Sequence, residues 1–137
     1  MTCVIVTKDI DHLTREYFRD TKCITSVVFE RVSTVRFIDA KTFWKFSIAR
    51  IPIPKSVETL GDYCFFRCKS LRFVDFEAGS VLRELGKGAF MESGLVKIEI
   101  PSSVSKISRC CFYCCKSLEI VVITGENLEI IEEGGFY

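Results

Sequence analysis

Two short hydrophobic patterns recur along the whole chain. The first places apolar residues at i, i+3 and i+5, and its copies begin 23 or 24 residues apart. Its five clear copies, after a degenerate one at Met1-Val4-Val6, are Ile24-Val27-Phe29, Ile48-Ile51-Ile53, Leu71-Val74-Phe76, Leu95-Ile98-Ile100 and Leu118-Val121-Ile123. The second pattern places apolar residues at i and i+3 and a Phe five residues further on. Its copies are Ile10-Leu13-Phe18, Val35-Ile38-Phe43, Val57-Leu60-Phe65, Leu82-Leu85-Phe90, Val104-Ile107-Phe112 and Leu128-Ile131-Phe136.

The spacing within each unit predicts short strands. In the first pattern the last two apolar residues alternate with another residue, which is the period of a strand with one buried face. The second pattern suits another short strand, and the segment before its Phe has room for one turn of helix. Between the two patterns the gap alternates between short and long, and the long form contains Glu77-Ala78-Gly79-Ser80.

Repeats of this length indicate a solenoid, because one unit cannot bury its apolar face and must stack on its neighbours. We therefore predict parallel strands and one domain, 1–137, which agrees with the usual domain size of roughly 100–200 residues. The expected units are 1–23, 24–47, 48–70, 71–94, 95–117 and the incomplete 118–137.

The repeat resembles a known family. The run LVKIEIPSSVSKI at 95–107, the glycines Gly61 and Gly86, and the pair Ala89-Phe90 resemble the BspA-like (treponeme-type) leucine-rich repeat. The recurring Cys-Lys-Ser-Leu at 68–71 and 115–118 resembles surface-antigen members of this family in protists. The resemblance implies an α/β leucine-rich repeat solenoid, shaped like a horseshoe, with a parallel sheet on the concave face and one-turn helices elsewhere. It also implies adhesion or protein binding at a cell surface, and no catalytic residues.

Composition narrows the classes of function. The chain has 19 Lys and Arg against 18 Asp and Glu, a net charge of +1, which argues against a general nucleic-acid binder or a polybasic membrane binder. No run approaches the roughly 18 apolar residues that span a bilayer, and the N-terminus lacks the pattern of a secretory signal. Cell-surface or secreted placement therefore rests on the resemblance, and a cytoplasmic protein stays open. We expect no metal or other cofactor, because one His and a lone C-x-x-C in the Cys110–Cys115 run do not supply four zinc ligands.

The outward-facing positions of the first pattern form the predicted binding surface. In a parallel stack they line up across neighbouring strands as two columns. One column holds Ser26, Arg50, Phe73, Lys97 and Ile120, and the other holds Val28, Pro52, Asp75, Glu99 and Val122. An aromatic residue between two cations is a typical binding anchor, and two adjacent acids would favour a basic partner. We expect a protein or glycan partner to contact Arg50, Phe73, Asp75, Lys97, Glu99, Ile120 and Val122.

Two other functions stay open. Solenoids need polar caps, and the last unit stops at Gly134-Gly135-Phe136-Tyr137, so the ends favour homo-oligomers formed end to end. A thiol oxidoreductase would use Cys111 and Cys114, but the βαβ context in which such a pair normally works is missing. The favoured hypothesis is a binding module without enzyme activity.

Overall fold

Each coil of the chain carries one longer strand and one two-residue strand. The computed structural model describes residues 2–136; Met1 and Tyr137, which belong to the first and last expected units, lie outside them. The longer strands are β1 (Thr2–Val6), β3 (Ile24–Phe29), β5 (Arg50–Ile53), β7 (Phe73–Phe76), β9 (Lys97–Ile100) and β11 (Ile120–Ile123). The short strands are β2 (His12–Leu13), β4 (Phe37–Ile38), β6 (Thr59–Leu60), β8 (Glu84–Leu85), β10 (Lys106–Ile107) and β12 (Ile130–Ile131).

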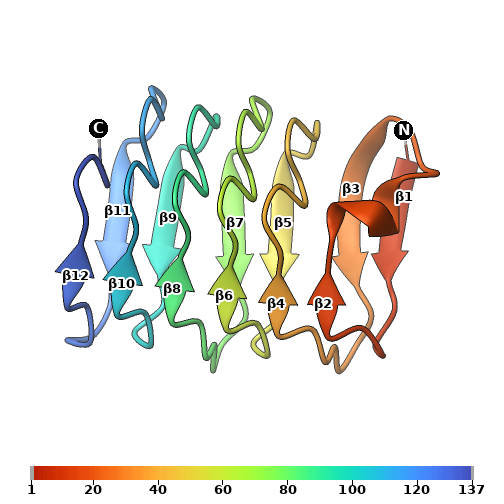
Figure 1. Ribbon diagram of the computed structural model, residues 1–137, viewed down its shortest axis with the longest axis horizontal. Coiled ribbons are helices and arrows are strands. Elements are labelled where there is room, and N and C mark those ends of the chain that lie inside the picture. The colour runs from red at the N-terminus through yellow and green to blue at the C-terminus, as the bar shows by residue number, and fades with distance from the viewer. Residues whose placement is uncertain (1, 137) are drawn as a thin grey trace.

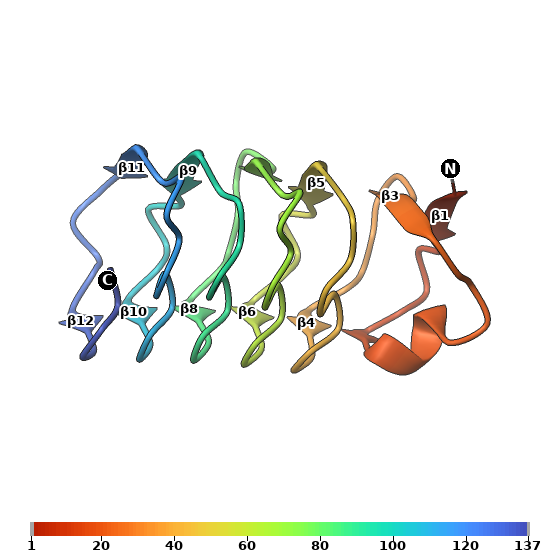
Figure 2. The ribbon, with the colours of Figure 1, turned by 90° about the horizontal axis from the view of Figure 1, so that it is seen from above.

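All strand pairs are parallel, as the repeat predicts. The short strands form one sheet in the order β12-β10-β8-β6-β4-β2, and the longer ones form the sheets β11-β9-β7-β5 and β1-β3. The longer and short strands run in opposite directions on two sides of the stack (Figure 1). The coils follow one another along a nearly straight axis (Figure 2). The molecule is therefore a parallel β-solenoid.

Prolines account for the break between β3 and β5. Just after β7, the N–H of Glu77 donates to the carbonyl of Ile53 in the preceding coil, at 3.0 Å. Its counterpart one coil earlier is Pro54, and Pro52 stands two residues before that, in register with Asp75. Every second residue of a parallel strand donates to the same side, so both prolines lack the N–H that would face β3. Consequently β5 is the edge of its four-stranded sheet.

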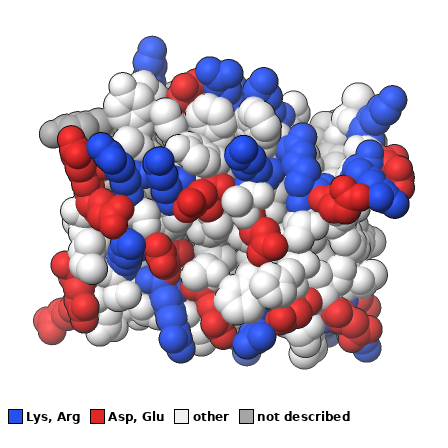
Figure 3. Space-filling view, viewed as in Figure 1, with Lys and Arg blue, Asp and Glu red and all other residues white. Residues whose placement is uncertain are grey.

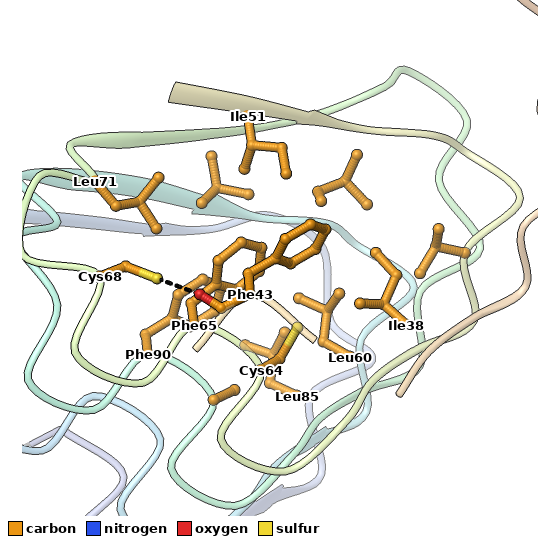
Figure 4. Packing of buried hydrophobic residues seen from close by; sticks show 14 of the residues in the cluster. Ile38, Phe43, Ile51, Leu60, Cys64, Phe65, Cys68, Leu71, Leu85 and Phe90 are labelled. Carbon is orange, nitrogen blue, oxygen red and sulfur yellow. Dashed lines mark hydrogen bonds between the residues drawn. The ribbon is translucent and has the colours of Figure 1, made fainter. Parts of the chain in front are cut away.

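A column of stacked phenylalanines runs through the core. Neighbouring rings have centroids 5.0 to 5.6 Å apart, and the rings of Phe65, Phe90 and Phe112 are parallel within 5°. Figure 4 shows Phe43, Phe65 and Phe90 one behind another, between apolar side chains of the two sheets. The column consists of the Phe residues of the second pattern: Phe18, Phe43, Phe65, Phe90, Phe112 and Phe136.

In the second to fifth coils the third side is a turn segment that bonds to the next coil. In the second coil the N–H groups of Lys41 and Lys45 donate to carbonyls of the third coil, both at 2.9 Å, and Tyr63 and Arg67 repeat this toward the fourth. All four residues have a positive φ of 56 to 61°, which turns their N–H groups out of the coil and away from their own chain. Helix needs these groups for bonds within the segment. Among residues 2–136 the expected one-turn helices are thus reduced to one 3₁₀ helix, η1 (Arg15–Phe18).

The phenylalanine column makes a stability prediction. Phe65 is fully buried, so Phe65→Ala removes a core ring and leaves a cavity. We expect the free energy of unfolding, measured by urea titration, to fall by about 3–5 kcal/mol. The matched change Phe73→Ala, at a side chain 37% exposed on a strand, should lower it by less than about 1 kcal/mol. Equal losses of unfolding free energy in the two variants would show that the phenylalanine column does not stabilise the core more than an exposed strand residue does.

Candidate binding surface

A groove of about 540 Å³ lies on the four-stranded sheet, over β5, β7 and β9. Its floor is formed by residues of these strands, and one wall is the loop from Glu77 to Ser80, which follows β7. The groove contains five of the seven residues expected to contact a partner: Arg50, Phe73, Asp75, Lys97 and Glu99. The sheet thus brings most of the expected surface together in one place.

The expected columns follow the register of this sheet. Arg50 pairs with Phe73, Phe73 with Lys97, and Lys97 with Ile120. Ile120 is 48% exposed on β11 but does not line the groove, and neither does its half-buried neighbour Val122. The prolines of β5 separate the first members of the columns, which lie on β3, from the four-stranded sheet.

Four charged side chains of the groove form two ion pairs, and the fifth, Glu77, accepts a backbone N–H. The Arg50 guanidinium donates two hydrogen bonds to the Asp75 carboxylate, with Nη2 at 2.9 Å from Oδ1, and it lies 5.0 Å above the Phe73 ring. Lys97 Nζ is 3.1 Å from Glu99 Oε1. The Arg50 hydrogen bonds hold the pKa of Asp75 below its ordinary value.

This pairing corrects one step of the sequence argument. Column alignment predicts that Asp75 and Glu99 repel each other and so attract a basic partner, but each carboxylate already has a cation from its own sheet. Asp75 is the diagonal neighbour of Arg50, two positions along on the next strand, and is within reach of its long side chain. Lys97 and Glu99 lie two residues apart on the same face of β9. The Phe73 ring remains as an exposed aromatic contact on the floor of the groove.

Sequence reasoning missed the wall of the groove. The segment 77–80 is the extra length of a long unit, and Gly79 turns it at φ +82°. Glu77 braces the wall against the preceding coil by accepting the N–H of Lys55 at 2.9 Å. The signal is visible as the alternating gap between the two patterns, but gap length alone does not say on which side the extra residues lie.

The cysteines belong to the core and the turns. Cys64 and Cys111 are fully buried, and burial raises the pKa of both thiols well above the ordinary value. Burial raises the pKa of Cys68 to about 12, and its Sγ donates to the carbonyl of Phe43 at 3.0 Å, as Figure 4 shows. A raised pKa keeps a thiol protonated and makes it a poor nucleophile. The arrangement therefore gives Cys111 no activation of the kind that an oxidoreductase uses.

Residues 2–136 contain no cluster of metal-ligating side chains. Within the same residues there is no helix with the length and hydrophobicity that a membrane crossing requires.

Comparison with known proteins decides the family. The family profile described as "BspA type Leucine rich repeat region (6 copies)" matches residues 36–137. The chain belongs to the BspA-type leucine-rich repeat family. The matched part of this leucine-rich repeat domain begins after η1 and β3, which lie in residues 1–35. No curated protein matches the sequence.

Two solved structures illustrate the likeness of this leucine-rich repeat domain. The pneumococcal vaccine antigen PcpA matches with a TM-score of 0.71 and 19% identity over 97% of this chain and 31% of its own. A leucine rich cell surface protein from Faecalibacterium prausnitzii matches with a TM-score of 0.49 and 25% identity over 74% of this chain and 34% of its own. The chain thus spans about a third of these proteins, and the likeness to PcpA establishes the fold.

The Arg50–Asp75 pair predicts a measurable titration. Because the folded pKa of Asp75 is lowered, the pair stabilises the fold at pH values above the ordinary pKa of Asp and loses this effect as the pH falls through the lowered value. We expect Arg50→Gln to raise the pKa of Asp75, followed by NMR of its carboxyl carbon. Lys97→Gln, which removes a charge from the same groove, should leave that pKa nearly unchanged. An unchanged pKa in Arg50→Gln would contradict the pairing.

Proposed function

We propose that this domain is a protein-binding module without enzyme activity, and that its groove receives an exposed loop or peptide segment of a partner. The observation that carries the proposal is Phe73, a large exposed apolar side chain on the sheet that floors the groove, between Arg50 and Lys97 of the adjacent strands. The groove is built on strands whose register the whole stack holds, so a partner meets a surface that is already formed. Adhesion to a partner-bearing surface is the role that we propose for this binding.

The groove has the composition of a binding hot spot with a polar rim. The Phe73 ring supplies apolar area, and Arg50 stacks on it, a combination common among energetically important contacts. Asp75 and Glu99 keep carboxylate oxygens that can accept further hydrogen bonds while their charges are neutralised by Arg50 and Lys97. Such a rim gives orientation and selectivity, and burial of the ring gives affinity.

A peptide display library tests this function, because it samples many candidate partner segments at once. Peptides enriched on the wild-type chain should bind Phe73→Ala at least about tenfold more weakly, because truncating a hot-spot aromatic costs about 2 kcal/mol or more and tenfold corresponds to about 1.4 kcal/mol. Tyr113→Ala is the matched control, since Tyr113 has nearly the same exposed fraction (40% against 37%) on the turn side of the stack. If the enriched peptides bind Phe73→Ala with the same affinity as the wild type, the groove is not their binding site.

A second function, association of chains through the end of the stack, has its own observation. In central coils the core residues Leu60 and Phe65 are buried, whereas their counterparts in the last coil, Ile131 and Phe136, are 51% and 41% exposed. A second copy packed on this face would cover them. We propose this as the alternative to partner binding.

Sedimentation across a range of protein concentrations tests the alternative. The wild-type chain should associate as concentration rises, and Ile131→Asp should remain monomeric because a charge in the covered face is unfavourable. Val32→Asp, at a loop side chain that is 83% exposed, serves as the control and should associate like the wild type. A wild-type chain that stays monomeric throughout would remove this function.

A further inference from the structure

A second hollow, of about 330 Å³, lies at the corner where the turn side meets the start of β5 and β7. It shares no lining residue with the groove, which begins at the first residues of these strands. Apart from Phe46, its lining residues end in charged or hydroxyl groups, while their aliphatic stems and the ring make much of its surface apolar. We call it the basic pocket; the residues are Lys45, Phe46, Ser47, Arg67, Lys69 and Ser70.

Positive charge exceeds negative charge around the basic pocket. Three cations line it, and the carboxylate beside them is that of Glu92, whose Oε2 lies 3.0 Å from Arg67 Nε and 3.5 Å from Lys69 Nζ. Lys45 has no carboxylate within 4.0 Å among residues 2–136; its Nζ lies 5.4 Å from the Trp44 ring centroid. One acid thus serves two cations and leaves the third uncompensated.

The repeat determines where these cations lie, and their backbone N–H groups already form hydrogen bonds with the next coil. Lys45 and Arg67 occupy the same position in consecutive coils, two residues after a Phe of the column. Their N–H groups donate to the carbonyls of Phe66 and Met91 in the next coil. The basic pocket therefore offers side-chain donors, while a peptide main chain finds there no free backbone ladder to extend.

Charge continues along the same side of the stack. Lys41 begins the turn that carries Lys45, and Lys87 lies on the turn two coils further on. Neither Nζ atom has a carboxylate within 4.0 Å among the residues that the structure describes; they lie 5.6 Å and 5.9 Å from the ring centroids of Trp44 and Tyr63, and the Asp62 carboxylate accepts the backbone N–H of Lys87 at 2.8 Å. Figure 3 shows Lys and Arg gathered over the upper part of this view, where the turns after β4, β6 and β8 lie in Figure 1. A row of cations over several coils fits a linear chain of repeated anionic groups better than a single ion.

We propose that the basic pocket binds sulfate groups of a sulfated polysaccharide. Ammonium and guanidinium groups and the two serine hydroxyls all donate hydrogen bonds, and a sulfate ester presents three acceptor oxygens and a charge that persists at every physiological pH. The polymer then extends along the turn side toward Lys41 and Lys87. This binding is independent of the groove around Phe73.

The test measures binding of a sulfated heparin hexasaccharide by calorimetry, with the desulfated hexasaccharide and sodium sulfate as comparison ligands. The variant Lys45→Gln/Lys69→Gln removes two cations of the pocket and should bind the sulfated ligand about tenfold more weakly. Lys8→Gln/Lys22→Gln changes the net charge equally at exposed lysines of the first coil and should bind like the wild type. Circular dichroism confirms that each variant is folded.

A gain-of-binding variant makes the test sharper. Glu92→Gln removes the carboxylate that occupies Arg67 and Lys69, so we expect it to bind the sulfated hexasaccharide more tightly than the wild type. Three results would overturn the proposal: no binding by the wild type, equal loss in the two double variants, or equal binding of the desulfated ligand. Binding of sodium sulfate as tight as that of the hexasaccharide, or of a phosphopeptide in its place, would also overturn it.

Discussion

The phenylalanine rings of adjacent coils in this solenoid have centroids 5.0 to 5.6 Å apart, and all of them except the ring of the last coil are buried. A coil alone cannot cover its own ring or the apolar residues beside it, so burial takes place between coils. The rings stack best in one relative position, and the parallel strands and turns on the three sides repeat that position through backbone hydrogen bonds. The register of the coils is therefore fixed both by the stacked rings in the core and by the backbone hydrogen bonds of the strands and turns.

Fixed register converts single positions of the repeat into columns on the surface. On the four-stranded sheet one column brings Arg50, Phe73 and Lys97 side by side. On the turn side another position brings Lys45 next to Arg67. The two surfaces lie at different parts of the same coils and differ in chemistry: an aromatic groove with paired charges, and a basic pocket with surplus charge. A solenoid of this size can in this way present two independent binding sites.

Much of the fold can be predicted from the sequence, because it depends on the spacing of the apolar residues. The period of the apolar residues predicts the parallel strands, the register of Arg50 with Phe73 and Lys97, and the buried phenylalanines. It does not predict the turns, because the positive φ of Lys41, Tyr63 and similar residues depends on bonds to the following coil, which spacing does not reveal.

The surface follows from the sequence in outline. Its columns are correct across β5, β7 and β9, but the Arg50–Asp75 pair depends on a diagonal side-chain contact that alignment of columns does not show. The basic pocket escapes sequence reasoning for a different reason. Whole-chain composition gives a net charge of +1, and this average hides the gathering of cations on one side. Sorting charges by position in the repeat would have shown Lys45 and Arg67 at equivalent places.

A double-mutant cycle tests most directly whether adjacent coils are coupled through the phenylalanine column. In the wild type the ring centroids of Phe65 and Phe90 are 5.2 Å apart. The free energies of unfolding would be measured for the wild type, for Phe65→Leu, for Phe90→Leu and for the variant with both changes. The cycle should give a coupling of about 0.5–1.5 kcal/mol for this adjacent pair, while Phe43 and Phe90, two coils apart, should be additive within about 0.5 kcal/mol. Additivity for the adjacent pair as well would contradict the account.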